Sequence, residues 1–283
     1  WKDGGLAWEY FVRPVNEAGD AETVMNHEAA TKIKELFGLY EGKEIAALYV
    51  KQDIPALGAS LTRMAQLMVA LNWGNLDSRQ KLMDGRGWNE QQVEAILNRL
   101  DERDWKFVQG VLDFINSYWP AIEAKEKRVN GIAPAKVVAA PITTQFGEMP
   151  GGYFHMSYDD RASPKAYGNR VKEISEQMMK GAFTRASTRR GHTKERVAGV
   201  RMPVRLDFGV ITEHVSQVIH DLTHHEMLID INRIFGNKQI ASTIVTMHGD
   251  VIYKQMQEAI RDVAAGSVPA IGAFEKSLNH VRT

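Results

Sequence analysis

Four of the nine histidines of the chain fall within thirteen positions, in the segment HVSQVIHDLTHHE at residues 214–226. His220 and His224 are spaced to share one face of a helix, where they could together bind a divalent metal ion. Asp221 takes the place of the general base in the zinc-protease pattern His-Glu-x-x-His, and is one methylene shorter than Glu. A catalytic zinc ion needs a third protein ligand. The candidates in the sequence are Glu213, His248 and His192.

A helical projection separates these four histidines. At about 100° per residue, His225 falls on an apolar seam and His214 lies beside it, roughly 16 Å away along the helix axis. These two histidines therefore cannot share a metal ion. The alternative to a metal site is a packing helix whose polar face, with His220 and His224, hydrogen-bonds neighbouring helices. The predicted seam consists of Ile211, Val215, Val218, Leu222, His225 and Ile229.

Residues 184–205 form a basic segment in a chain that is neutral overall. The segment holds seven basic residues and one acidic residue, a net charge of +6, whereas the whole chain has 35 of each. Such a patch could neutralise a phosphate backbone with salt-dependent affinity. Alternatively, its side chains pair with acidic helices of the same chain. The basic residues are Arg185, Arg189, Arg190, Lys194, Arg196, Arg201 and Arg205.

Several classes of function are excluded or disfavoured by composition. The chain has no cysteine, which excludes disulfides, thiolate zinc sites, iron–sulfur clusters and cysteine nucleophiles. It also lacks a phosphate-binding glycine loop and a Gly-x-Ser-x-Gly nucleophile motif. No apolar run reaches the ~18 residues of a membrane span. The start WKDGG, without Met or a signal pattern, predicts a piece of a longer protein.

Helical periodicity covers most of the chain and predicts a mainly α fold, a bundle-like array of helices. Asn89 and Gln92 have capping-box spacing, Pro120 should kink or divide its helix, and an interruption is expected near Gly249. The predicted helices are 21–40, 56–74, 76–85, 88–100, 102–131, 165–183, 206–235, 238–266 and 273–283.

Residues 131–163 differ in character from the helical regions. They are rich in proline and β-forming residues, which predicts an extended connector with a short hairpin around Gly151 and Gly152. The predicted organisation is an N-terminal helical region at 1–130, this connector, and a C-terminal helical region at 164–283. The two helical regions could also form one continuous domain.

Three segments together resemble a known module. They contain DWKFVQ at 104–109, GGYFHMSYDD at 151–160, and RGHT at 190–193 followed by the helix that carries LDFGVITEH. Over about residues 88–245 the chain resembles a module of very large tailed-phage and prophage proteins, the polyvalent or internal virion (ejection) proteins. His155 stands where that pattern has Pro. The resemblance carries over no catalytic residues.

This resemblance implies a non-enzymatic scaffold without a cofactor, located in the virion or in the host cytoplasm after entry. Its partners would be other virion or phage proteins, further copies of itself, or DNA, contacted through the basic segment. Two alternatives stay open. One is a metal-dependent hydrolase that binds zinc or another divalent ion through His220 and His224, with Asp221 or Glu213 as base. The other is a dedicated DNA-binding module.

Overall fold

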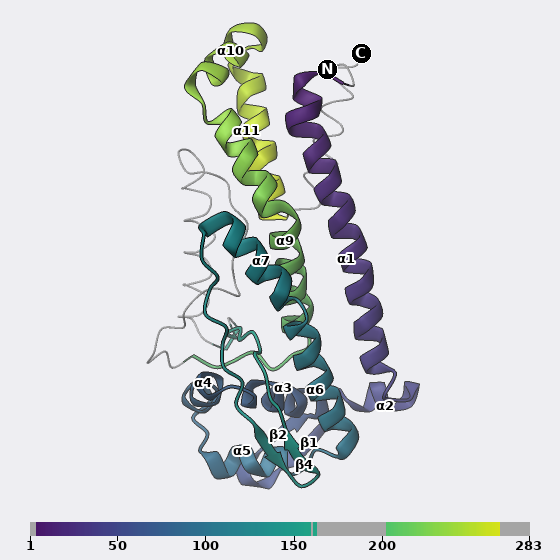
Figure 1. The fold of residues 1–283 in the computed structure, drawn as a ribbon. Coiled ribbons are helices and arrows are strands. Elements are labelled where there is room, and N and C mark those ends of the chain that lie inside the picture. Colours follow the sequence, from purple (N-terminus) through teal and green to yellow (C-terminus); the bar gives the residue numbers. More distant parts are fainter. Residues whose placement is uncertain (1–3, 160, 163–201, 267–283) are drawn as a thin grey trace. The chain divides into compact units, whose positions relative to one another are not determined.

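The computed structural model describes residues 4–159, 161–162 and 202–266 (Figure 1). Helices make up most of this part of the chain, and the strands form two small antiparallel hairpins, so the predicted mainly α fold is confirmed. The helices predicted at 165–183 and 273–283 lie outside the described residues.

The chain divides into two compact units, and each unit combines segments that are separated in the sequence. Of the described residues, unit 1 contains 4–27 and 216–266, and unit 2 contains 28–159, 161–162 and 202–215. The predicted boundaries at 130 and 163 do not coincide with this division. The division instead falls within two helices, α1 (Arg13–Phe37) and α9 (Gly209–Phe235).

Unit 1 is built from helices. A π-helical turn, η1 (Trp8–Val12), leads into α1, and α9 is followed by α10 (Lys238–His248) and α11 (Asp250–Ala265). Asn237 starts α10, because its side chain accepts hydrogen bonds from two backbone N–H groups of the first turn. The break between α10 and α11 falls at Gly249, as the sequence predicts.

The core of unit 1 joins η1 to the end of α9 and to α11. The rings of Phe11 and Phe235 meet edge to face with centroids 5.4 Å apart, and the Tyr253 hydroxyl donates to the Phe235 carbonyl at 2.9 Å. Each large apolar side chain that is fully buried stabilises such a core by roughly 1.5–3 kcal/mol. The buried residues of this cluster are Phe11, Leu228, Ile231, Phe235, Met256, Ile260 and Ala264.

Unit 2 is organised around one buried helix, α3, which packs against α4, α5 and α6 (Figure 1). Every residue of α3 after its first is buried. The elements are α2 (Gly42–Ala47), β1 (Lys51–Ile54), η2 (Pro55–Leu57), β2 (Ala59–Thr62), α3 (Arg63–Trp73), α4 (Leu76–Arg86), α5 (Glu90–Leu97), α6 (Glu102–Asn116), α7 (Trp119–Asn130), β3 (Ile142–Thr144) and β4 (Gly147–Met149).

Local signals set most helix ends of unit 2 where the sequence predicts them. Asn89 and Gln92 form the predicted capping box at the start of α5, with both reciprocal hydrogen bonds at 2.9 Å. Pro120 divides the predicted helix 102–131, since α6 ends at Asn116 and α7 places the proline in its first turn, where no N–H donor is needed.

The first hairpin of unit 2 was not predicted. β1 and β2 pair antiparallel, and β2 lies within the helix that the sequence predicts from 56 onwards. Gly58 adopts a φ of +59°, which permits the turn, and the Thr62 side chain accepts a hydrogen bond from Ala65 N at 3.1 Å. This cap delays the start of α3 to Arg63.

The second hairpin lies N-terminal to its predicted position around Gly151 and Gly152. β3 and β4 pair with Ile142 opposite Met149, so the Gly151–Gly152 pair follows the hairpin. The N–H groups of Ala140 and Gly152 both donate to the Gly74 carbonyl, at 2.8 and 3.1 Å. A Cβ at Gly151, where φ is +73°, would lie 2.2 Å from the Ala140 carbonyl oxygen. The glycine pair therefore permits close backbone packing rather than a turn.

Within the described ranges, no helix combines the length and the apolarity needed to cross a membrane.

Candidate functional site

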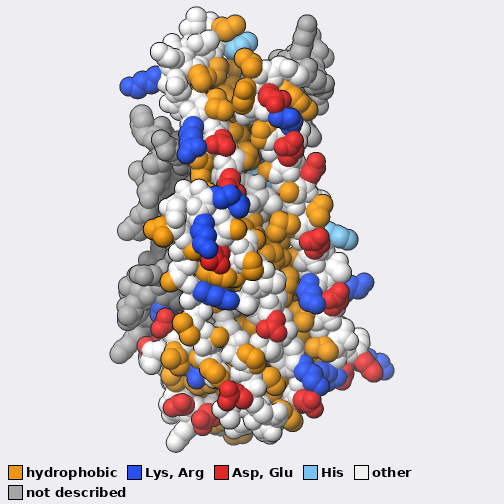
Figure 2. All heavy atoms as spheres, in the orientation of Figure 1, with side chains coloured by type: hydrophobic (Ala, Val, Ile, Leu, Met, Phe, Trp, Pro, Cys, Tyr) orange, Lys and Arg blue, Asp and Glu red, His pale blue; other side chains and the backbone are white. Residues whose placement is uncertain are grey.

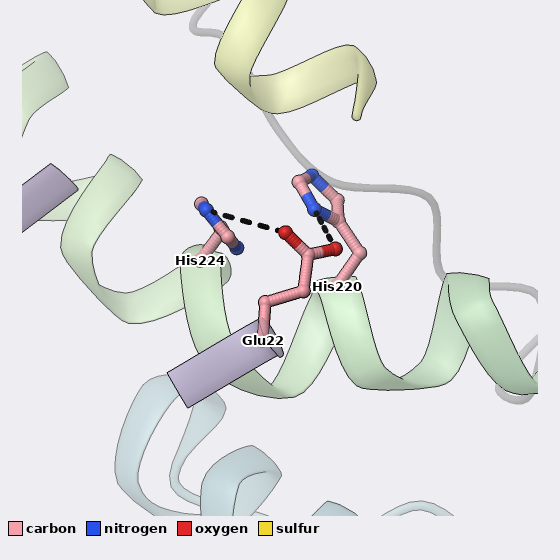
Figure 3. A group of neighbouring side chains, drawn as sticks. All are labelled: Glu22, His220 and His224. Carbon is pink, nitrogen blue, oxygen red and sulfur yellow. Dashed lines mark hydrogen bonds and ion pairs between the residues drawn. The ribbon is translucent and has the colours of Figure 1, made fainter. Parts of the chain in front are cut away.

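The histidine-rich part of α9 contributes to a compact cluster in unit 1. His220 and His224 lie on adjacent turns, with ring centroids 4.3 Å apart and planes inclined by 24°. Glu22 of α1 extends its carboxylate between the two rings (Figure 3). Glu22 Oε1 is 3.1 Å from His220 Nδ1, and Glu22 Oε2 is 3.9 Å from His224 Nε2. One ligand atom from each residue lies within 4.8 Å of the other two.

Burial distinguishes the two sides of this cluster. The histidines are almost completely buried, at 9% and 4% exposure, whereas the Glu22 side chain is 28% exposed. The helix face that carries His220 and His224 is therefore not the solvated polar face of an amphipathic helix. Buried apolar residues lie on several sides of α9, while Leu222 and Ile229 of the predicted seam are only half-buried.

The hydrogen bonds of Thr223 fix the tautomer of His224. The Thr223 hydroxyl donates to the Ile219 carbonyl at 2.9 Å, and its oxygen lies 2.8 Å from His224 Nδ1. Since a hydroxyl has a single proton, this oxygen accepts from Nδ1–H. His224 Nε2 then has a free lone pair, which faces the Glu22 carboxylate across 3.9 Å.

His220 is incompletely satisfied. Glu22 accepts a hydrogen bond from its Nδ1, whereas the buried Nε2 has no hydrogen-bond partner among the described residues. A buried polar atom without a partner costs roughly 1–3 kcal/mol.

Burial and the neighbouring groups shift the pKa values of His224 and Glu22. Burial, and then the neighbouring His220, lower the pKa of His224 to about 4, so this ring is neutral at pH 7. Burial raises the pKa of Glu22, but the hydrogen bond from His220, together with the charge interactions with His220 and His224, outweighs burial and leaves that pKa below its ordinary value. A carboxylate beside a neutral imidazole favours the approach of a cation.

Asp221 does not occupy the position of a general base in this cluster. Its carboxylate is completely buried, and Oδ1 lies 3.7 Å from Nδ1 of His225, one turn further along α9. In the His-Glu-x-x-His pattern the acid must lie beside the metal-bound water. The arrangement thus retains the two predicted ligands and lacks the predicted base.

His214 belongs to a different environment, within unit 2. Its ring stacks on that of His155, with centroids 4.4 Å apart and planes inclined by 3°, and Tyr153 approaches at 6.0 Å. His155 is the residue that departs from the phage-protein pattern, and here it contacts a histidine of α9. As the projection predicts, His214 and His225 take no part in the Glu22 cluster.

Two of the predicted third ligands, Glu213 and His248, do not belong to the cluster. Glu213 forms an ion pair with Arg205 at 3.0 Å, His248 is the exposed last residue of α10, and His192 lies outside the described residues. Glu22 takes this role instead. No sequence signal singles it out, because it is one of several acidic residues on a long polar helix.

The basic segment can be assessed at one position only. Residues 184–201, and with them Arg185, Arg189, Arg190, Lys194, Arg196 and Arg201, lie outside the described residues. Arg205 is paired with Asp207 at 2.9 Å as well as with Glu213. At this position the geometry fits the intrachain ion pairing that the sequence left open.

An apolar surface covers part of α10 and the start of α11. Helix α10 has no buried residue, although Ile240, Ile244 and Met247 form a stripe along it. Ile244 packs partly against the core of unit 1, while Met247 and Val251 are 70% and 67% exposed. Figure 2 shows hydrophobic side chains gathered over these two helices. We call Ile240, Met247 and Val251 the α10 surface.

Comparison with known proteins adds no assignment. No protein-family model, no curated protein and no solved structure matches the chain. Any functional conclusion therefore depends on the residues and the geometry described above.

Proposed function

We propose that the chain is a non-enzymatic interaction module of a large phage-encoded protein that travels in the virion or is ejected into the host. The series of segments between residues 88 and 245 supports the phage origin. The position of Asp221, completely buried and facing His225, disfavours the hydrolase alternative, because no acid of α9 is placed to activate a metal-bound water.

The α10 surface is the observation that carries this proposal. A helix in a packed unit normally buries its apolar stripe, yet α10 leaves both ends of its stripe in solvent. Exposed apolar side chains that gather in one place mark surfaces for protein contact. We therefore assign the interaction of this module to α10 and the start of α11.

A second copy of the chain is the partner that we propose for this surface. The formal net charge is zero, so long-range repulsion does not keep copies apart. In a virion protein present in several copies, self-association through α10 would serve the assembly of the particle rather than an enzymatic reaction.

Sedimentation equilibrium of the purified chain tests this proposal. We expect concentration-dependent association, which the double substitution Met247→Glu with Val251→Glu abolishes because each adds a charge to the contact. Val138→Glu is the matched control, since Val138 is 81% exposed and belongs to unit 2. A chain that stays monomeric at tens of micromolar, or that binds duplex DNA as a monomer with steep salt dependence, contradicts the proposal.

A further inference from the structure

We propose that Glu22, His220 and His224 bind one divalent transition-metal ion of the zinc class, and that this ion cross-links α1 to α9 within unit 1. The inference goes beyond the proposed interaction function and does not depend on it. The sequence identifies two of the ligands, and the fold supplies the third from a residue 198 positions away.

The chemistry of the three donors suits zinc. Two imidazole nitrogens and one carboxylate oxygen are a donor set that zinc binds with three protein ligands and one water. Harder ions such as Ca²⁺ and Mg²⁺ prefer oxygen ligands, and softer sites use thiolates, which this chain lacks. The exposed edge of the Glu22 side chain gives the ion a path from solvent and a place for the water.

The distances suit the size of a zinc site. With bonds of about 2.0–2.1 Å, ligand atoms around a tetrahedral zinc lie about 3.3 Å apart. The separations are 3.1 Å from Glu22 Oε1 to His220 Nδ1 and 3.9 Å from Glu22 Oε2 to His224 Nε2, and one ligand atom of each residue lies within 4.8 Å of the other two. We expect the ion to draw the three side chains together.

His224 is already prepared as a ligand. Its Nδ1–H donates to Thr223, which leaves the lone pair of Nε2 directed at the carboxylate. Two electron-rich atoms that face each other across 3.9 Å repel, and a cation between them turns this repulsion into attraction. Metal-bound histidines commonly donate their second N–H in this way, which holds the ring in place. Thr223 is therefore a positioning residue.

Binding at His220 requires a change of tautomer that conserves the proton. In the structure as described, Nδ1–H donates to Glu22 and Nε2 has a lone pair without a partner. The ion would bind the tautomer in which Nδ1 has the lone pair and Nε2 has the proton. The ring stays neutral, and the three ligands together contribute one negative charge to the divalent ion.

Titration of the full chain with Zn²⁺, followed by calorimetry, tests the site directly. We expect one ion per chain. Glu22→Gln and His224→Gln should each weaken binding by more than roughly 100-fold, and Thr223→Val by roughly 10–100-fold, the usual effect of losing a residue that orients a ligand. The matched control is His27→Gln, because His27 is exposed on the same helix as Glu22 and lies outside the cluster.

Co²⁺ supplies a second readout that a general loss of structure does not imitate. We expect visible absorption bands of low-coordinate cobalt in the wild type and in His27→Gln, and none in Glu22→Gln. Since Glu22 is partly exposed, its replacement should leave the far-ultraviolet circular dichroism unchanged. Zinc binding that is absent in the wild type, or equally strong in Glu22→Gln and His224→Gln, overturns the proposal.

Discussion

Two buried polar clusters, one in each unit, differ in how completely their atoms are hydrogen-bonded. In unit 2 the carboxylate of Asp104, which is 1% exposed, accepts from the Tyr40 hydroxyl at 2.9 Å and from Asp101 N at 3.0 Å. It also forms an ion pair with the Arg63 guanidinium. Burial and then the Asp104 charge raise the pKa of Tyr40, so the hydroxyl remains a donor.

In unit 1, by contrast, the Glu22–His220–His224 cluster has an unpartnered nitrogen and a lone pair that faces a carboxylate. A buried polar network stabilises a fold when every polar atom in it has a hydrogen-bond partner, and a buried polar atom without one needs an explanation. The Asp104 cluster is therefore architectural, because it anchors the start of α6 to α3. In the Glu22 cluster, His224 Nε2 and the Glu22 carboxylate face each other across 3.9 Å, where a cation would be attracted to both.

The largest expected effect is in the satisfied cluster. Asp104→Ala should lower the free energy of unfolding of unit 2 by about 3–5 kcal/mol. The Arg63 guanidinium would keep only the more distant carboxylate of Asp101, at 3.6 Å, and the Tyr40 hydroxyl would lose its acceptor. Urea unfolding followed by tryptophan fluorescence measures this change. Asp113→Ala on the exposed side of α6 is the control, with an expected change of about 0.5 kcal/mol or less. A similar loss in both variants would show that the Asp104 cluster has no special role.

An intermediate effect is expected from zinc in the unsatisfied cluster. At a free Zn²⁺ concentration 100 times the dissociation constant, the wild type should gain about 2.7 kcal/mol of stability, seen as a higher melting temperature. Glu22→Gln should show no gain. Without zinc, this substitution at a partly exposed position should change stability by less than about 1 kcal/mol. A large loss of stability in Glu22→Gln without zinc would show that the Glu22 cluster stabilises the fold, as the Asp104 cluster does.

The smallest effect is expected at an ion pair in solvent, Arg205 with Asp207. The hydrogen bond from Arg205 is the main reason why the pKa of Asp207 lies below its ordinary value. Because the folded-state pKa is depressed, the stabilisation is complete above the unfolded pKa of about 3.9 and is lost as the pH falls through the folded pKa. Asp207 is more than half exposed, so the contribution is under about 1 kcal/mol.

Unfolding of wild type and Asp207→Asn between pH 7 and pH 2 checks this last prediction. The two stability curves should differ at neutral pH and converge in acid. Curves that stay parallel would mean that the ion pair with Asp207 adds nothing to stability.

Local structure was predicted from the sequence where a few neighbouring residues decide it. The capping box of Asn89 and Gln92, the division of a helix at Pro120 and the break at Gly249 all depend on backbone hydrogen bonds within one turn. The hairpin of β1 and β2 was missed because its short strands have no alternating pattern and precede a strongly helical segment.

For the candidate site, the sequence alone determined that His220 and His224 share a helix face, since a spacing of four residues and the helix pitch are enough. It also separated them from His214 and His225. Only the tertiary structure decided that Glu22 joins them and that Asp221 faces His225 instead. The physical reason is that helix periodicity fixes directions around one axis, whereas the residue that meets a given face depends on how distant helices pack.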